Sequence, residues 1–132
     1  FSSLKALKWL FKKINSEGYP PRLILKNKFN FVERIDILSQ SLRLIILFEN
    51  NLKLNKLDKI KIYNLVRNIL NYQKFNSKNI REKGGFFWGK KSNGEHMHHL
   101  NTWVTAFAAQ SLSILSNKKS KKILKLNPFY LI

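Results

Sequence analysis

The sequence predicts an all-α protein made of two antiparallel helical hairpins. Four segments place apolar residues at helical spacing, and they cover residues 4–14, 34–49, 57–72 and 100–116. The first and third carry lysine along one side, whereas the second and fourth are apolar around almost the whole circumference. Because a helix that is apolar all round is a buried one, the order along the chain is outer, inner, outer, inner.

The first hairpin is expected over residues 1–50. Its outer helix ends at the sequence NSEGYPP, where a glycine and two prolines stop a helical pattern. The second hairpin is expected over residues 51–117, with an amphipathic outer helix and a nearly uncharged inner helix. A tail at residues 118–132 follows, and its lysine-rich run KKSKKILK is typical of a solubilising chain end.

An internal repeat supports this arrangement. The segments LSQSLRLIIL and AAQSLSILS align on Gln40 and Gln110, each of which is followed by Ser-Leu. A long loop with glycine and aromatic residues precedes each inner helix, GYPPRLILKNKFNF in one case and GGFFWGKKSNGEHMHH in the other. The offset of 70 residues is long for a two-helix solenoid unit but suits hairpins with elaborated inner loops.

Composition limits the class of protein. An apolar fraction of 44% and an aromatic fraction of 13% suit a packed core despite the net charge of +18. Such a charge normally indicates an anionic partner, but the basic residues are mostly lysines spread along the whole chain, as AT-rich coding produces. Arginine, which contacts bases and clamps phosphates, is sparse, so compositional bias explains the charge better than a nucleic-acid surface does.

The ends and the apolar runs of the chain bear on its compartment and completeness. Cysteine is absent, no signal peptide is visible, and the longest apolar run, Leu44–Phe48, is too short to span a bilayer. We therefore expect a cytoplasmic protein without a membrane partner. The first residue is phenylalanine, and two hairpins with apolar inner helices would leave an apolar face open. These features favour a single partial domain, the C-terminal fragment of a longer protein, which would self-associate through that face.

The segments RIDILSQSLRL and GGFFWG…HLNTWVTAFAAQSL resemble inner helices and their entry loops in α/α-toroid enzymes. In that fold one ring of helices lies inside another, and glycine-aromatic loops line one mouth of the cavity. The resemblance is nearest to the six-hairpin glycosidase-like group of hydrolases, polysaccharide lyases and sugar epimerases. Protein prenyltransferases and terpene cyclases form a second group, whose Gly-Gly-Phe loops are similar to residues 84–86. The resemblance implies that this chain is an arc of an α/α toroid.

In a toroid, the loops that enter the inner helices point into the central cavity. The resemblance then implies that acid–base groups come from four side chains: Glu95, His98, His99 and Asp36. Other side chains of these loops and helix starts would hold a sugar ring: Trp88, Phe87, Tyr19, Arg34, Asn101 and Trp103. The acids at these junctions are Glu33, Asp36 and Glu95, from which any glycosidase-type carboxylate pair, about 5–10 Å apart, must come.

Simpler roles compete with this assignment. The sequence EHMHH lacks the i, i+4 histidine spacing of a helical zinc pair, so we expect no metal and no cofactor. Asn101 or Thr102 would equally serve as a helix cap, and Asp36 as a favourable charge in a first helical turn. Trp103 and Phe107 are four residues apart, a spacing typical of core residues.

Two classes of function follow from the sequence. The first is the C-terminal part of a carbohydrate-active toroid enzyme, a hydrolase, lyase or epimerase, with residues 84–103 lining its cleft and the fragment alone inactive. The alternative is a segment of a prenyltransferase-like or terpene cyclase-like toroid, or a non-catalytic basic helical module that binds nucleic acid or an acidic partner.

Overall fold

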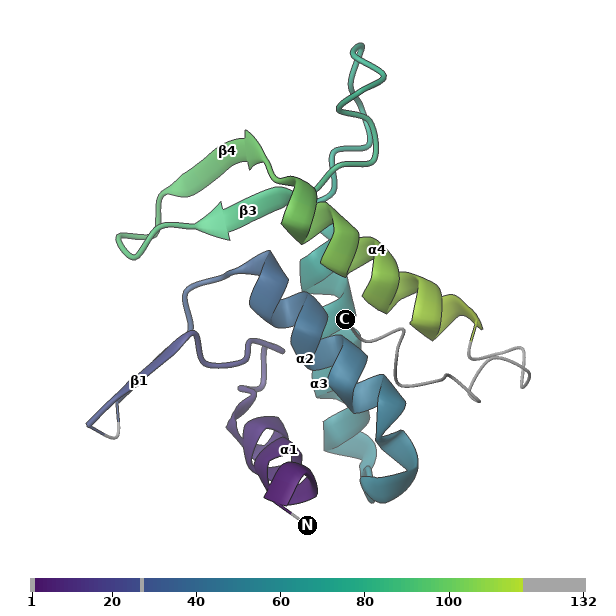
Figure 1. The fold of residues 1–132 in the computed structure, drawn as a ribbon. Helices are drawn as coiled ribbons and strands as arrows, with labels where there is room; N and C mark the ends of the chain where they lie inside the picture. The colour runs from purple at the N-terminus through teal and green to yellow at the C-terminus, as the bar shows by residue number, and fades with distance from the viewer. Residues whose placement is uncertain (1, 27, 118–132) are drawn as a thin grey trace.

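One β-hairpin follows the first α-helix and another follows the third in a computed structural model that describes residues 2–26 and 28–117 (Figure 1). Four α-helices lie where the apolar periodicity predicts them: α1 (Ser2–Lys13), α2 (Ile35–Leu47), α3 (Lys56–Leu70) and α4 (Thr102–Asn117). A 3₁₀ turn, η1 (Glu49–Asn51), joins α2 to the segment before α3. The predicted tail lies outside the described residues.

The prediction of an all-α protein is wrong. The two long loops before the inner helices fold as antiparallel hairpins, β1 (Leu23–Leu25) with β2 (Lys28–Asn30) and β3 (Phe87–Lys90) with β4 (His96–Leu100). Their sequences contain strand signals that helical periodicity does not detect. β1 is formed by the aliphatic run LIL, and an Asn-Gly pair, a strong hairpin-turn signal, lies between β3 and β4.

The helix α2 is central to the packing, since it contacts α1, α3 and α4. Figure 1 shows α2 and α4 side by side and running in the same direction, with α3 antiparallel to them. Each of the two parallel helices is preceded by a β-hairpin. The repeat predicted from Gln40 and Gln110 therefore corresponds to two hairpin–helix units in space.

The prediction that both inner helices are buried all round is wrong for α4. On α2, the apolar side chains of Leu38, Leu42 and Ile45 are almost fully buried. On α4, the buried residues are Val104, Ala108 and Ser111, whereas Trp103 is 73% exposed. The difference arises because short side chains make the buried face of α4, so its large aromatic residues are left on other sides.

The helix α3 anchors the loop that follows α1. A capping box starts α3. The Asn55 side chain accepts from the backbone N–H of Asp58, and the Asp58 carboxylate accepts from the backbone N–H of Asn55. Further along α3, Asn64 and Asn68 donate to backbone carbonyls of residues 16 and 17. Gly18 packs directly on the α3 backbone at a positive φ of 86°, which no side chain would permit. These contacts place Tyr19 beside the end of α3.

Among the described residues, none of the helices is both long enough and apolar enough to pass through a bilayer.

Candidate functional site

Glu33, just before α2, is the single carboxylate among the described residues that line a cavity of about 380 Å³. The cavity, named here the Glu33 cavity, lies between the end of α3, the β3–β4 hairpin and the segments that lead into α2. Its walls are formed by residues of these elements: Tyr19, Glu33, Asn71, Tyr72, Phe87, Lys90, His96, Met97 and His98. A volume of this size suits a small ligand such as one sugar ring.

Two side chains hold the Glu33 carboxylate. The Nζ atom of Lys90 lies 2.6 Å from Oε2, and the Tyr72 hydroxyl donates to the same oxygen at 2.8 Å. Tyr19 lines the same cavity. Burial acts to raise the pKa of Glu33, but the hydrogen bonds from Lys90 and Tyr72 outweigh it and lower that pKa below its ordinary value. Glu33 is therefore ionised at neutral pH.

The two tyrosines remain protonated. Burial and the adjacent charge of Glu33 raise the pKa of Tyr19 to about 12. Burial and the hydrogen bond to Glu33 raise the pKa of Tyr72 as well. The cavity thus offers, at one point, a carboxylate acceptor, an ammonium donor and two phenolic hydroxyls, which is the kind of set that hydroxyl groups of a ligand can join.

Backbone contacts fix the strand that carries Lys90. The Lys90 N–H donates to the Glu33 carbonyl at 2.8 Å, and the Phe87 N–H donates to the Tyr72 carbonyl at 3.0 Å. Gly89 lies between them at a φ of 130°, and a Cβ there would lie 2.4 Å from the Glu33 carbonyl oxygen. Only glycine permits this approach, so Gly89 allows β3 to pack against the entry to α2.

Aromatic and imidazole rings continue from the end of α3 along β4. The Tyr72 ring stacks on His96 with centroids 5.9 Å apart, and His96 stacks on His98 at 6.1 Å. The edge of Phe87 meets His98 at 6.4 Å. These rings give the Glu33 cavity an apolar wall and place two imidazoles, groups that commonly transfer protons near neutral pH, beside an ionised carboxylate.

Four of the sequence-predicted residues form a separate cluster next to the cavity. The Arg34 guanidinium lies 4.5 Å from the centroid of the Trp88 ring, and its Nε donates to Asp36 at 3.0 Å. The His99 ring also lies near Trp88, with ring centroids 6.1 Å apart. Asp36 also accepts the N–H of Ile37 in the first turn of α2, so a structural role for this carboxylate is present alongside its ion pair.

The remaining predicted residues lie away from the Glu33 cavity. Glu95 is exposed in the turn between β3 and β4, where hydrogen bonds from Lys91 and Asn93 lower its pKa. Asn101 caps α4 by accepting the Val104 N–H at 3.0 Å, as its position in the sequence suggested. Trp103 is exposed on α4 beside Phe107.

The structure brings together Tyr19, Phe87 and His98, which the sequence predicts as site residues, but the sequence does not predict the partners of Glu33. Tyr72 ends the α3 pattern and was assigned to an amphipathic outer helix, and Lys90 is one of many lysines. His96 was recognised only as part of the EHMHH sequence. Lys90 is the last residue of β3. Strand propensity in the segment before it is the sequence signal that could have identified this strand, and with it the position of Lys90.

No family model matches this chain, and no curated protein or solved structure is significantly similar to it. Within residues 2–26 and 28–117, no group of three or more histidine, cysteine, aspartate or glutamate side chains could hold a metal ion. The function must therefore be inferred from the Glu33 cavity and its surroundings.

Proposed function

We propose that this chain is part of a carbohydrate-active protein and binds a sugar unit of its substrate in the Glu33 cavity. The observation that carries the proposal is the ionised Glu33 carboxylate, joined to Tyr72 and Lys90 in a cavity that Tyr19 and other aromatic rings line. Sugars present hydroxyl groups at their edges and C–H groups on their faces. The polar cluster suits the hydroxyls, and the Phe87 and Tyr72 rings suit the faces.

The reaction that fits this cavity best is proton transfer, as in a lyase or an epimerase. Hydrolysis of a glycosidic bond uses two carboxylates that flank the bond. Within the described part of the chain, Glu33 is the only carboxylate that lines the cavity, whereas Asp36 is paired with Arg34 and Glu95 with Lys91. Imidazole groups are suited to accept and return a proton, so His96 and His98 are the candidate acid–base residues.

A glycan-binding screen followed by titration calorimetry tests the proposal. We expect neutral or acidic oligosaccharides to bind the wild-type chain and Glu33→Gln to weaken that binding about tenfold, since a hydrogen bond to a charged group contributes about 1.5–3 kcal/mol. Glu17→Gln is the matched control, because Glu17 is exposed on the loop after α1 and does not line the cavity. Equal affinities for wild type and Glu33→Gln would overturn the assignment to this cavity.

A third variant separates this proposal from the assignment made on sequence alone. Glu95→Gln changes the carboxylate in the β3–β4 turn and leaves intact the Glu33 cluster, which consists of Glu33 with its partners Tyr72 and Lys90. Loss of glycan binding in Glu95→Gln, with normal binding in Glu33→Gln, would move the site to the hairpin turn. His98→Ala in the same assay, and in a turnover assay on any glycan that binds, tests the acid–base role. We expect it to reduce turnover more than binding.

A further inference from the structure

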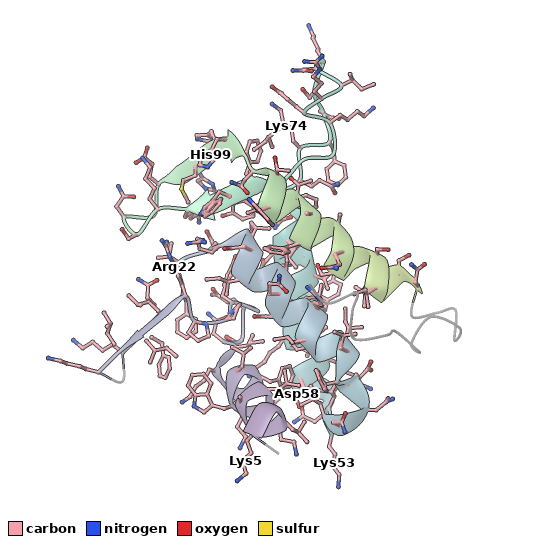
Figure 2. All side chains as sticks on the ribbon, viewed as in Figure 1. Lys5, Arg22, Lys53, Asp58, Lys74 and His99 are labelled. Atoms are coloured by element: carbon pink, nitrogen blue, oxygen red, sulfur yellow. The ribbon has the colours of Figure 1, made fainter. Side chains whose placement is uncertain are left out.

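A second cavity, of about 500 Å³, lies between α1, residues 51–55 and the first turns of α3. Figure 2 shows Lys53 and Asp58 of this region at the opposite end of the molecule from His99 on β4. The cavity is therefore separate from the Glu33 cavity. Its size is within the range of small-molecule sites.

Four lysines from three segments surround this cavity: Lys8 and Lys12 of α1, Lys53, and Lys61 of α3. None of the four lysine side chains forms an ion pair or a hydrogen bond with another described residue. The sole carboxylate among the described lining residues is Asp58, which is engaged in the capping box of α3. Four lysines against one aspartate leave an excess of three positive charges, which a bound multivalent anion would relieve.

The floor of this lysine cavity is apolar. Phe11 and Leu52 are almost fully buried and belong to the core, and Leu54 is half-buried beside them. A purely ionic ligand would leave the exposed part of Leu54 in contact with water. The combination of an apolar floor with a cationic rim suits a ligand that has an apolar body and a strongly charged head.

We propose that the lysine cavity binds a phosphate monoester with an apolar body, its dianionic phosphate among the four lysines and its apolar part on Phe11, Leu52 and Leu54. A phosphate monoester carries close to two negative charges at neutral pH and three acceptor oxygens. Lysine ammonium groups bind phosphate as point charges, so no fixed bidentate geometry is needed. Soluble phosphate esters and the phosphatidic acid headgroup share this chemistry.

Calorimetric titration of the chain with naphthyl phosphate and with inorganic phosphate tests the proposal, at ionic strengths of about 0.05 and 0.15 M. We expect naphthyl phosphate to bind at least about tenfold more tightly than inorganic phosphate, because its ring covers the apolar floor. The double variant Lys8→Gln/Lys53→Gln is expected to weaken naphthyl phosphate binding about tenfold. The matched control, Lys78→Gln/Lys83→Gln, removes the same charge from exposed lysines of the loop before β3 and should change binding less than twofold.

Circular dichroism melting of both double variants verifies that each is folded. An equal loss of binding in the two variants would show diffuse attraction to a basic surface and overturn the proposal. Equal affinity for naphthyl phosphate and inorganic phosphate, or no binding of either, would overturn it as well. Sedimentation with phosphatidic acid vesicles identifies the source. Vesicle binding that is lost in Lys8→Gln/Lys53→Gln assigns the site to the lipid headgroup, and binding of soluble naphthyl phosphate without vesicle binding assigns it to a soluble ester.

Discussion

The two β-hairpins occupy equivalent places in the chain, each directly before one of the parallel helices α2 and α4, yet they differ in packing. The β1–β2 hairpin projects from the body of the molecule (Figure 1), and its aliphatic residues Leu23, Ile24 and Leu25 are exposed. The β3–β4 hairpin packs against the entry to α2 and the end of α3, through bridges from Gly89 to Arg34 and from Phe86 to Gln73.

This difference explains why the candidate site lies on one hairpin. A two-stranded ribbon is at best marginally stable by itself, so a hairpin that positions reactive side chains must be held by other elements. β3–β4 receives that support from backbone bonds to Glu33 and Tyr72, which are also the residues whose side chains form the Glu33 cluster. The same contacts thus fix the hairpin and assemble the site.

The largest effect is expected at Gly89. Gly89→Ala would bring a Cβ to within 2.4 Å of the Glu33 carbonyl oxygen at a φ of 130°, and strain together with displaced backbone should lower the free energy of unfolding by about 3–5 kcal/mol. Urea denaturation measures the change. Gly94→Ala is the control, because Gly94 has a positive φ but open space around it, and it should cost only about 1 kcal/mol. Similar costs for the two variants would contradict the role of close packing at Gly89.

A smaller effect is expected for Tyr72→Phe. This change removes the hydroxyl that donates to the Glu33 carboxylate at 2.8 Å, and a hydrogen bond to a charged group is worth about 1.5–3 kcal/mol. We expect a loss of about 2 kcal/mol in urea denaturation. Tyr63→Phe, on α3, provides the comparison, since Tyr63 is 67% exposed and its hydroxyl should be dispensable. If both variants are as stable as wild type, the Glu33 cluster contributes nothing to folding.

The pH dependence of stability provides a second test of whether Glu33 and its partners stabilise the fold. The pKa of Glu33 in the folded chain lies below the ordinary value of 4.5, so its ionised form is favoured by folding. That contribution is complete above pH 4.5 and is lost as the pH falls through the folded pKa. Glu33→Gln should therefore lose stability at pH 7 and show a flatter decline as the pH falls below 4.5. A decline as steep as that of wild type would assign the acid sensitivity to other carboxylates.

The smallest effect is expected on the β1–β2 hairpin. Leu25 is 60% exposed, so Leu25→Thr, which keeps a strand-forming residue, should change the free energy of unfolding by less than about 0.5 kcal/mol. Thermal melting followed by circular dichroism is sufficient to measure it. A loss above about 2 kcal/mol would mean that this hairpin is packed in solution and that the contrast with β3–β4 is smaller than the structure indicates.

The sequence by itself determined the four helices and the similarity between the segments around Gln40 and Gln110. Helical periodicity is a local property, and the apolar stripes at residues 4–14, 34–49, 57–72 and 100–116 depend only on neighbours a turn away. The cap at Asn101 is equally local. The hairpins were also encoded locally, by the LIL run and the Asn-Gly pair, but helical patterns on either side obscured those signals.

Only the tertiary structure decided which residues form the candidate site. Glu33, Tyr72 and Lys90 come from three distant segments, and Tyr72 lies 39 residues from the carboxylate that it binds. No periodicity links such positions, because their meeting depends on how α3 and β3 pack around the entry to α2. The same packing decided that Trp103, spaced as a core residue, is exposed, since the α4 face that meets α2 is the one with short side chains.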